Sequence, residues 1–162
     1  MTLASQAVAG LREAGATVAT AESLTGGLVC ATLVSVAGAS DVVLGGIVAY
    51  APSAKVDLLG VDADLIATHG TVDPEVAVQL ATGACERFGA TYGLSTTGVA
   101  GPDPSEGKPV GTVHIAVAGP GGVSTTELTL EGDRDTIRTR TVDALLSQLV
   151  ATLGEESRSS RG

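Results

Sequence analysis

Residues 20–27, Thr-Ala-Glu-Ser-Leu-Thr-Gly-Gly, constrain the fold of this chain more than any other stretch. The apolar run before them, 16–21, predicts a β-strand, and the run after them, 28–36, predicts an apolar helix. A strand that turns into a helix here places hydroxyl groups at a helix N-terminus, where free N–H groups and the helix dipole favour negative charge. Ser23 therefore suits a nucleophile or an anion site. Alternatively, Ser23 or Thr25 only caps the helix, and the glycines form a tight turn.

The remaining chain alternates between helical and strand patterns. Further helices are expected at 5–14, 53–59, 62–68, 74–88 and 133–153, and further strands at 42–50, 91–97, 110–118 and 123–130. The run 42–50 is apolar on both faces, which is typical of a central strand covered on both sides. The last two strands form a hairpin, so part of the sheet is antiparallel. This order predicts a single α/β domain over 1–154, a three-layer α/β/α arrangement with a mixed sheet, followed by a disordered polar tail at 155–162.

Composition narrows the classes of protein that fit. The 162 residues suffice for one domain with a full core, which must be built from Val, Leu, Ile and Ala because there is no Trp, one Phe and two Tyr. The formal net charge of −9 argues against sequence-independent nucleic-acid binding, which needs a basic surface. A small phosphorylated ligand held by a few local cations remains compatible with that charge.

Several kinds of site and location are not expected. Cys30 and Cys85 lie far apart in apolar helical patterns and are expected to be buried, inert thiols. The two histidines stand alone, so no metal site and no cofactor are expected. Residues 1–10 lack the pattern of a secretion signal, and Gly38-Ala39-Ser40-Asp41 interrupts the apolar segment 28–50. We therefore expect a cytoplasmic protein with no membrane or nucleic-acid partner, and by base rate a homo-dimer.

Four polar stretches fall at the ends of the predicted strands or at the start of the last helix, where sites of α/β folds occur. They are the Ser23 turn, the segment from Tyr50 to Lys55, the loop Ser95-Thr96-Thr97-Gly98-Val99-Ala100-Gly101-Pro102, and Gly132-Asp133-Arg134 with Arg138 and Arg140.

Taken in order, these motifs resemble the CinA C-terminal domain family over nearly the whole chain. The motifs are Ala-Glu-Ser-x-Thr-Gly-Gly at 21–27, Gly-Gly-x-Val-x-Tyr at 45–50 with Lys55 five residues on, Thr-Gly-x-Ala-Gly-Pro at 97–102, and Lys-Pro-Val-Gly-Thr-Val at 108–113. The known activity in that family is nicotinamide-nucleotide amidohydrolase, which converts nicotinamide mononucleotide and water to nicotinate mononucleotide and ammonia. Because the chain begins at the first helix of the amidohydrolase domain, it resembles the stand-alone form.

The resemblance implies a role for four residues. Ser23 would be the nucleophile and Lys55 its base, while Tyr50 and Thr97 would line the same site. The residues themselves agree with this chemistry, because no histidine accompanies Ser23 in any motif and a serine with a lysine base is a known variant of the catalytic triad. Lys55 must then be buried enough to lose its proton near neutral pH. The alternative is that Lys55 is a solvated helix lysine.

The expected substrate is a small nucleotide, and its contacts are less fixed by the sequence. Candidate binding residues are Thr25, Gly26, Gly27, Gly98, Gly101, Arg134 and Arg138. Arg134 and Arg138 share a helix face that excludes Arg140, and either could hold phosphate, as could Lys108. Alternatively, these arginines form a solvated face paired with neighbouring carboxylates.

Two positions depart from the family pattern. Leu24 stands where cysteine is usual, and Pro52-Ser53 stands where an asparagine and an acidic residue are common. Two other functions remain open: a binding or regulatory module that keeps the pocket without turnover, and an enzyme of another class that acts on a phosphosugar or nucleotide. The lack of a Walker or Rossmann pattern weighs against the last.

Overall fold

The computed structural model describes all 162 residues as one α/β domain with a five-stranded sheet. The elements are α1 (Leu3–Ala14), β1 (Val18–Glu22), α2 (Leu28–Val34), the 3₁₀ turn η1 (Ala39–Asp41), β2 (Val43–Val48), α3 (Pro52–Leu59), α4 (Ala63–His69), α5 (Pro74–Phe88), β3 (Tyr92–Gly98), β4 (Thr112–Gly119), β5 (Gly122–Thr129) and α6 (Arg134–Ser159).

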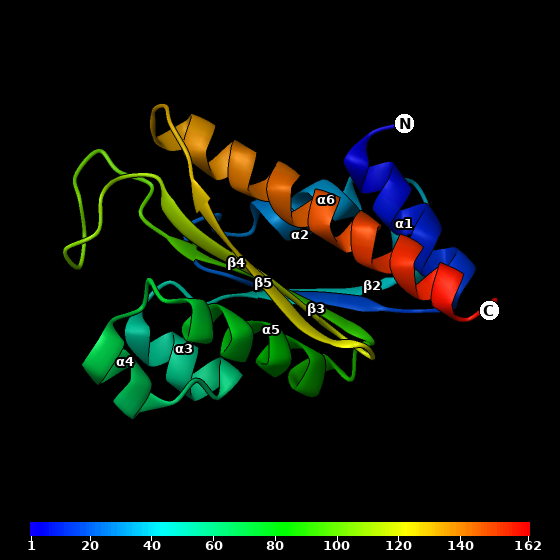
Figure 1. The fold of residues 1–162 in the computed structure, drawn as a ribbon, viewed down its shortest axis with the longest axis horizontal. Helices are drawn as coiled ribbons and strands as arrows, with labels where there is room; N and C mark the ends of the chain where they lie inside the picture. Colours follow the sequence, from blue (N-terminus) through cyan, green and yellow to red (C-terminus); the bar gives the residue numbers. More distant parts are fainter.

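The sheet separates two helical layers, as Figure 1 shows: α1, α2 and α6 cover one face, and α3, α4 and α5 cover the other. The strand order is β2-β1-β3-β4-β5. Strand β1 is parallel to both β2 and β3, whereas β4 runs antiparallel to β3 and to β5. The predicted three-layer arrangement with a mixed sheet is confirmed.

The helix boundaries follow from the capping residues in the sequence. Asp73 caps α5 by accepting from the N–H groups of Glu75 and Val76, and Pro74 occupies the first turn. The helix ends at Gly89, whose φ of 63° is the left-handed conformation that glycine adopts without strain. Asp133 caps α6 in the same way through the N–H of Thr136.

Small residues allow α5 to pack closely on the sheet. A Cβ at Gly93 of β3 would lie 2.0 Å from the carbonyl oxygen of Ala81. Ala77 and Ala81 of α5 pack against Ala116 and Ala118 of β4. The core on the other face is a larger cluster of 23 buried residues between the sheet and α1, α2 and α6. A chain almost without aromatic residues thus reaches close packing with alanine, glycine and branched side chains.

The structure corrects two expectations. The run 42–50 forms β2 at the edge of the sheet and not at its centre, since alternate residues, including Leu44 and Val48, are exposed. The segment 155–159 continues α6 instead of being disordered, and the Tyr92 hydroxyl donates to the carboxylate of Glu156 in its last turns.

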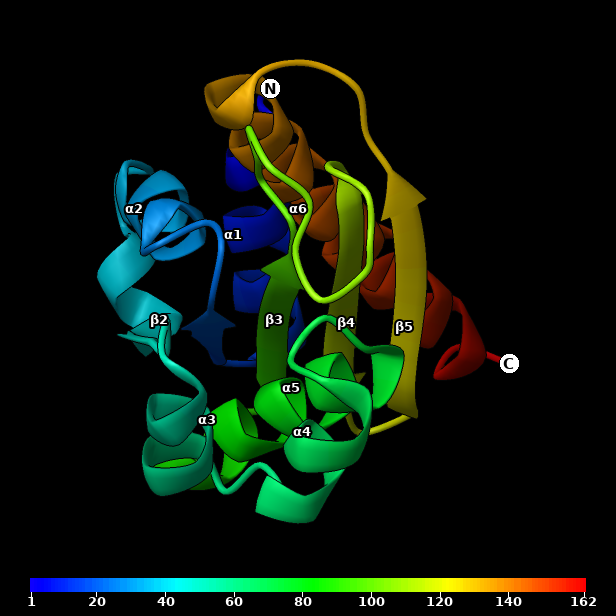
Figure 2. The same ribbon diagram turned by 90° about the vertical axis from the view of Figure 1, so that its left-hand side faces the viewer.

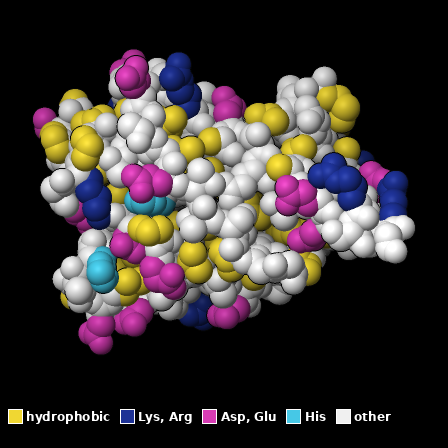
Figure 3. All heavy atoms as spheres, viewed as in Figure 1, with side chains coloured by type: hydrophobic (Ala, Val, Ile, Leu, Met, Phe, Trp, Pro, Cys, Tyr) yellow, Lys and Arg dark blue, Asp and Glu magenta, His cyan; other side chains and the backbone are white.

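Three further observations concern the cysteines, the length of the helices and the charge of the surface. Cys30 and Cys85 are half-buried, not fully buried as expected, and burial raises the pKa of both thiols. None of the helices combines the length and hydropathy needed to span a membrane. On the face seen in Figure 3, acidic side chains are widely spread and no continuous basic patch is present.

Candidate active site

The loops that follow β1, β2 and β3 meet at one end of the sheet, the end that faces the viewer in Figure 2. These strands are parallel, so their carboxyl ends lie side by side, and Glu22 is in register with both Val48 and Thr96. The beginning of α6 and the loop 99–111 complete this end of the molecule. The four polar stretches expected to form a site therefore converge.

Lys55 contacts Ser23 at this end of the sheet. Lys55 lies on α3, and its Nζ donates a hydrogen bond to Ser23 Oγ at 2.8 Å. The same Nζ donates to the main-chain carbonyls of Ala49 at 2.7 Å and Tyr50 at 3.0 Å. Only 1% of Lys55 and 8% of Ser23 is exposed. The structure thus brings the two residues together, and Lys55 is not a solvated helix lysine.

Burial sets the protonation of Lys55. Loss of hydration disfavours the charged ammonium and lowers its pKa from 10.5 to about 8, although the carboxylate of Glu106 acts in the opposite direction. The three acceptors around Nζ suit the ammonium form. In the neutral amine, two N–H groups remain for the two carbonyls, and the lone pair is left for the Ser23 hydroxyl. One geometry therefore serves both protonation states.

The turn that carries Ser23 is fixed by the residue before it. The buried carboxylate of Glu22 accepts from Thr25 Oγ1 at 2.6 Å and from the N–H groups of Val29 at 2.8 Å and Cys30 at 3.0 Å. It therefore caps α2, while Gly27, the residue at the N-cap position, has no side chain to do so. The simple alternative, a hydroxyl cap from Ser23 or Thr25, is wrong. The sequence signal for Glu22 was a carboxylate at the end of an otherwise uncharged strand.

Thr96 and Thr97 of β3 have different partners. Thr96 lies beside the Ser23 turn: the N–H of Ser23 donates to the carbonyl of Thr96 at 3.1 Å and to its Oγ1 at 3.2 Å. The hydroxyl of Thr97 donates to the carbonyl of Thr71 at 2.7 Å and contacts neither Ser23 nor Lys55 through a hydrogen bond. Thr97 is buried at the same end of the sheet. Sequence reasoning named Thr97 and missed Thr96.

Arg134 and Tyr50 contact each other at the same end of the sheet. Arg134 donates to the hydroxyl of Tyr50 at 3.2 Å and to the carbonyl of Gly101 at 2.5 Å. Both acceptors are neutral, so the guanidinium charge is not balanced by a carboxylate. Tyr50 is 61% exposed, which leaves its ring accessible from solvent.

Arg138 binds the main chain of the turn that carries Ser23. Its Nε donates to the carbonyl of Leu24 at 2.9 Å, and its Nη2 donates to the carbonyl of Thr25 at 3.1 Å. An exposed carboxylate, Asp135, lies 3.8 Å from its Nη1. Of the two arginines expected to face the site, Arg138 is therefore committed to main-chain carbonyls.

The chain also offers unpaired main-chain N–H groups here. Those of Leu24 and Thr25, which follow Ser23, have no hydrogen-bond partner in the protein, and neither do those of Ala100 and Gly101. All four residues are buried. Gly26 and Gly101 adopt φ values of 58° and 87°, a conformation that side chains disfavour. Buried donors without partners can hold an anion or an oxyanion.

The loop 99–111 is tied to the segment before α5. The carboxylate of Glu106 accepts from the N–H groups of Thr71 and Val72, and Lys108 donates to the carbonyls of Val72 and His69. Lys108 is thus engaged with the main chain. On the neighbouring strand β4, His114 lies opposite Thr97 in the antiparallel register. The Nδ1 atom of His114 has no hydrogen-bond partner, and burial lowers the pKa of the imidazole.

Comparison with known proteins identifies the family of this chain. The sequence profile of the CinA C-terminal domain matches residues 1–153. The chain belongs to the CinA C-terminal domain family. It is 52% identical over 136 residues, 84% of the chain, to a CinA-like protein from Frankia casuarinae. It is likewise 52% identical over 132 residues, 81% of the chain, to one from Anaeromyxobacter dehalogenans.

Solved structures of CinA-type proteins have the same fold. The competence/damage inducible protein CihA from Agrobacterium tumefaciens superposes with a TM-score of 0.89 at 40% identity, covering 94% of this chain and 93% of that one. A CinA-superfamily protein from Klebsiella pneumoniae gives a TM-score of 0.92 at 29% identity, covering 94% and 96%. The matched regions make up 31% and 32% of the two curated relatives, so this CinA domain spans about a third of their length.

The two departures from the family pattern are accommodated in this CinA domain. Leu24 is 4% exposed, belongs to the large core cluster, and offers its carbonyl to Arg138. Pro52 begins α3, and both Pro52 and Ser53 are exposed. Leu24 therefore stands as a core residue where cysteine is usual. Pro52 and Ser53 stand at an exposed place where an asparagine and an acidic residue are common.

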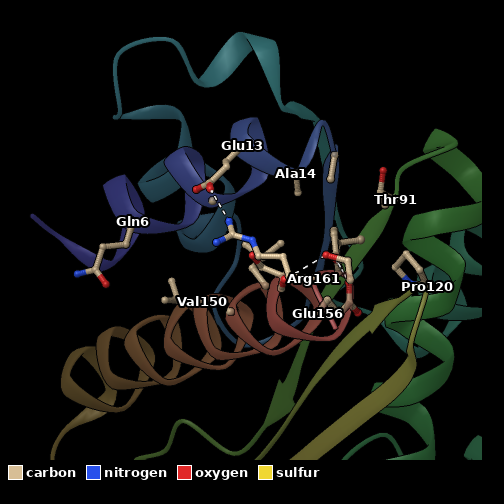
Figure 4. A pocket seen from close by; sticks show the side chains of 15 residues that line it. Gln6, Glu13, Ala14, Thr91, Pro120, Val150, Glu156 and Arg161 are labelled. Carbon is tan, nitrogen blue, oxygen red and sulfur yellow. Dashed lines mark hydrogen bonds and ion pairs between the residues drawn. The ribbon is translucent and has the colours of Figure 1, made fainter.

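A well-defined cavity of the CinA domain lies elsewhere. It has a volume of about 610 Å³ and is lined by residues of α1, β3 and α6, including Glu13, Tyr92 and Glu156, and by Arg161, which follows α6. Figure 4 shows it between the first and last helices, where Arg161 pairs with Glu13 at 3.5 Å. None of the predicted site residues lines it. No group of three or more His, Cys, Asp and Glu side chains is placed to hold a metal ion.

Proposed function

We propose that this CinA domain is a nicotinamide-nucleotide amidohydrolase, which hydrolyses the carboxamide of nicotinamide mononucleotide with Ser23 as nucleophile and Lys55 as base. The observation that carries the proposal is the 2.8 Å contact between Lys55 Nζ and Ser23 Oγ in a buried environment. A lysine with a pKa of about 8 is neutral in about one tenth of molecules at pH 7 and in half at pH 8.

The proposed chemistry begins with proton transfer from Ser23 Oγ to the lone pair of Lys55 Nζ as Oγ attacks the carboxamide carbon. The resulting ammonium of Lys55 then gives this proton to the leaving nitrogen, and ammonia departs from an ester on Ser23. A water molecule hydrolyses the ester, again with Lys55 as base. The sum consumes one amide and one water and yields one acid and one ammonia. The two carbonyl acceptors keep Nζ in place throughout.

The oxyanion of the tetrahedral intermediate needs preorganised donors. The N–H of Ser23 is already bound to Thr96, so it is a poor candidate. The unpaired N–H groups of Leu24 and Thr25 follow the nucleophile directly and are the donors that we assign to the oxyanion. Each such donor contributes on the order of 10²–10³ in rate in a known serine hydrolase.

The substrate phosphate needs an available cation. We assign it to Arg134, because its present partners are a tyrosine hydroxyl and a carbonyl that a phosphate can replace with a stronger, charge-assisted bond. Arg138 and Lys108 are less suitable because both are bound to main-chain carbonyls that hold loops in place. The unpaired N–H groups of Ala100 and Gly101 lie in the loop that Arg134 contacts and supply further donors.

The test is ammonia release from nicotinamide mononucleotide by the purified chain, with the variants Lys55→Arg and Lys55→Ala. Arginine keeps the charge but does not deprotonate at working pH, so both variants should lose turnover. Binding of the nucleotide, measured by calorimetry, should persist in Lys55→Arg. An arginine variant that retains much of the turnover would rule out the general-base role and leave Lys55 as a ligand contact.

The same measurements distinguish a binding module from an enzyme. A wild-type chain that binds the nucleotide but releases no ammonia across pH 7–9 would support a regulatory or binding role. A chain that neither binds nor turns over nicotinamide mononucleotide would overturn the substrate assignment.

A further inference from the structure

Glu22 is a buried carboxylate that no cation balances. It is 1% exposed, and its hydrogen-bond partners are all neutral donors: the hydroxyls of Thr20 and Thr25 and the N–H groups of Val29 and Cys30. No ion pair involves it. Four donors and no acceptor around two oxygens suit the ionised carboxylate, which only accepts hydrogen bonds. The N-terminus of α2 adds favourable dipole charge.

This carboxylate sets the direction of a short chain of hydrogen bonds. Because Glu22 only accepts, the proton of Thr25 Oγ1 points to Glu22 Oε1 at 2.6 Å. Thr25 Oγ1 is then the acceptor in its 2.9 Å contact with Thr96 Oγ1. The proton of the Thr96 hydroxyl is used in that bond, so Thr96 Oγ1 accepts from the N–H of Ser23 at 3.2 Å.

The chain of bonds ends on the main chain of the proposed nucleophile. It ties down the N–H of Ser23 and leaves the N–H groups of the next two residues, Leu24 and Thr25, without partners. A turn held in this way presents Ser23 Oγ to Lys55 on one side and free N–H groups on the other. Small displacements matter here, because a misplacement of about 1 Å can cost on the order of 10²-fold in rate.

We infer that Glu22 is a positioning residue for Ser23: its carboxylate, acting through Thr25 and Thr96, fixes the main chain of the nucleophile turn. This inference rests on the proposed function in so far as Ser23 is the nucleophile, but it does not depend on which amide is the substrate. It assigns to Glu22 a role in turnover beyond capping α2.

Thr96 allows the two roles of Glu22 to be separated. Glu22→Gln keeps the size of the side chain but brings an NH₂ group toward donors, so it disturbs both the helix cap and the hydrogen-bond chain. Thr96→Val removes one hydroxyl and leaves the bonds from Glu22 to Val29 and Cys30 intact. Thr96→Ser restores the hydroxyl. The helix cap is therefore constant across the Thr96 pair while the connection to Ser23 changes.

The experiment measures kcat and KM for ammonia release, and the rate at which a fluorophosphonate labels Ser23, detected by intact-protein mass spectrometry. We expect Glu22→Gln to lower kcat and the labelling rate by about 10- to 100-fold, and Thr96→Val to lower both by about tenfold. KM should stay within about twofold of the wild-type value, and the midpoint of the pH profile should stay within about 0.3 pH unit of it. Thr96→Ser should recover at least half of the wild-type rate.

The matched control is Asp62→Asn, which alters the carboxylate that caps α4 outside the site. It should leave kcat and labelling unchanged. If Thr96→Val and Glu22→Gln only lower the melting temperature while labelling stays at the wild-type rate, the positioning role is overturned and Glu22 is a structural cap. If wild-type Ser23 is not labelled at all, both this inference and the proposed nucleophile fail. If labelling follows the expected order but nicotinamide mononucleotide is not hydrolysed, only the substrate assignment fails.

Discussion

The two ends of the sheet differ in how their polar groups are used. At the carboxyl ends of β1, β2 and β3, Ser23, Lys55 and Glu22 are buried, Lys55 donates to Ser23, and Glu22 accepts from Thr25. At the opposite end lies the cavity of about 610 Å³, where Glu13 pairs with Arg161 and Glu156 accepts from the hydroxyl of Tyr92. The first end has a buried lysine with a lowered pKa, whereas the charged side chains Glu13, Glu156 and Arg161 of the second have protein partners.

This difference shows that the size of a cavity and the reactivity of the side chains around it are separate properties. A large hollow offers space, but reactivity depends on groups held in a costly state by their surroundings. Lys55 is such a group because burial works against its charge. In contrast, burial and Glu156 raise the pKa of Tyr92 in the cavity, which keeps the phenol protonated. Changes at the first end should therefore lower activity, whereas changes at the cavity should lower stability and leave activity unchanged.

Replacement of Ser23 by alanine should give the largest effect on activity. Removal of the nucleophile in a known serine hydrolase costs about 10⁶ in rate, and we expect a loss of at least about 10³-fold in ammonia release here. The matched control is Ser95→Ala, because the buried hydroxyl of Ser95 donates only to the carbonyl of Ala77. That variant should lose about 1 kcal/mol of stability and keep its turnover. A Ser23→Ala loss below about tenfold would place the nucleophile elsewhere.

The pH dependence of turnover should follow the ionisation of Lys55. In the proposed mechanism the neutral amine of Lys55 is the active form, so the rate should rise with pH through a midpoint near 8. Between pH 7 and pH 9 this gives about a tenfold increase for a single ionisation. Measurement of kcat/KM from pH 6 to pH 10 checks this. A rate that falls over that range would contradict the assignment of Lys55 as base.

Glu106→Gln should shift this profile slightly and in a defined direction. The carboxylate of Glu106 raises the pKa of Lys55, so its removal should lower that pKa further and increase the neutral fraction at pH 7. Because Glu106 is exposed, screening should limit the shift to less than about half a pH unit. Glu86→Gln, at an exposed position on α5, serves as the control and should leave the midpoint in place.

Variants of the cavity should leave turnover unchanged. Tyr92→Phe removes the bond to Glu156 and should cost about 1 kcal/mol of stability, measured by urea unfolding. Its kcat and KM should match those of wild type. If Tyr92→Phe instead raises KM for the nucleotide, the cavity takes part in binding, and the contrast between the two ends is incomplete.

Much of the fold could be predicted because local signals were strong. Asp73, Pro74 and Gly89 mark both ends of α5, and the structure places that helix at Pro74–Phe88. The position of β2 could not be read in the same way, since an apolar strand at an uncovered edge has the same composition as one in the centre. Likewise, the polar composition of 155–159 gave no sign of the contact between Glu156 and Tyr92.

The motifs could predict which residues belong to the candidate site, but they could not predict the hydrogen bonds among them. The motifs named Ser23 and Lys55, and the structure joins them. That Arg138 binds the carbonyls of Leu24 and Thr25 could not be predicted, because it depends on where α6 crosses the sheet. The role proposed for Glu22 could not be predicted for the same reason: its two main-chain donors belong to residues seven and eight positions away, and only the turn brings them to the carboxylate.

The uncovered edge of β2 also affects how the protein behaves at high concentration. Leu44 and Val48 are 44% and 49% exposed on a strand without charged residues, so this edge can pair with other strands. The net charge of −9 keeps copies of the chain apart near neutral pH. Near the isoelectric point of about 4.5 that repulsion disappears, and aggregation through β2 should then limit how far the protein can be concentrated. The acidic surface thus opposes association through the apolar edge strand when the protein is concentrated.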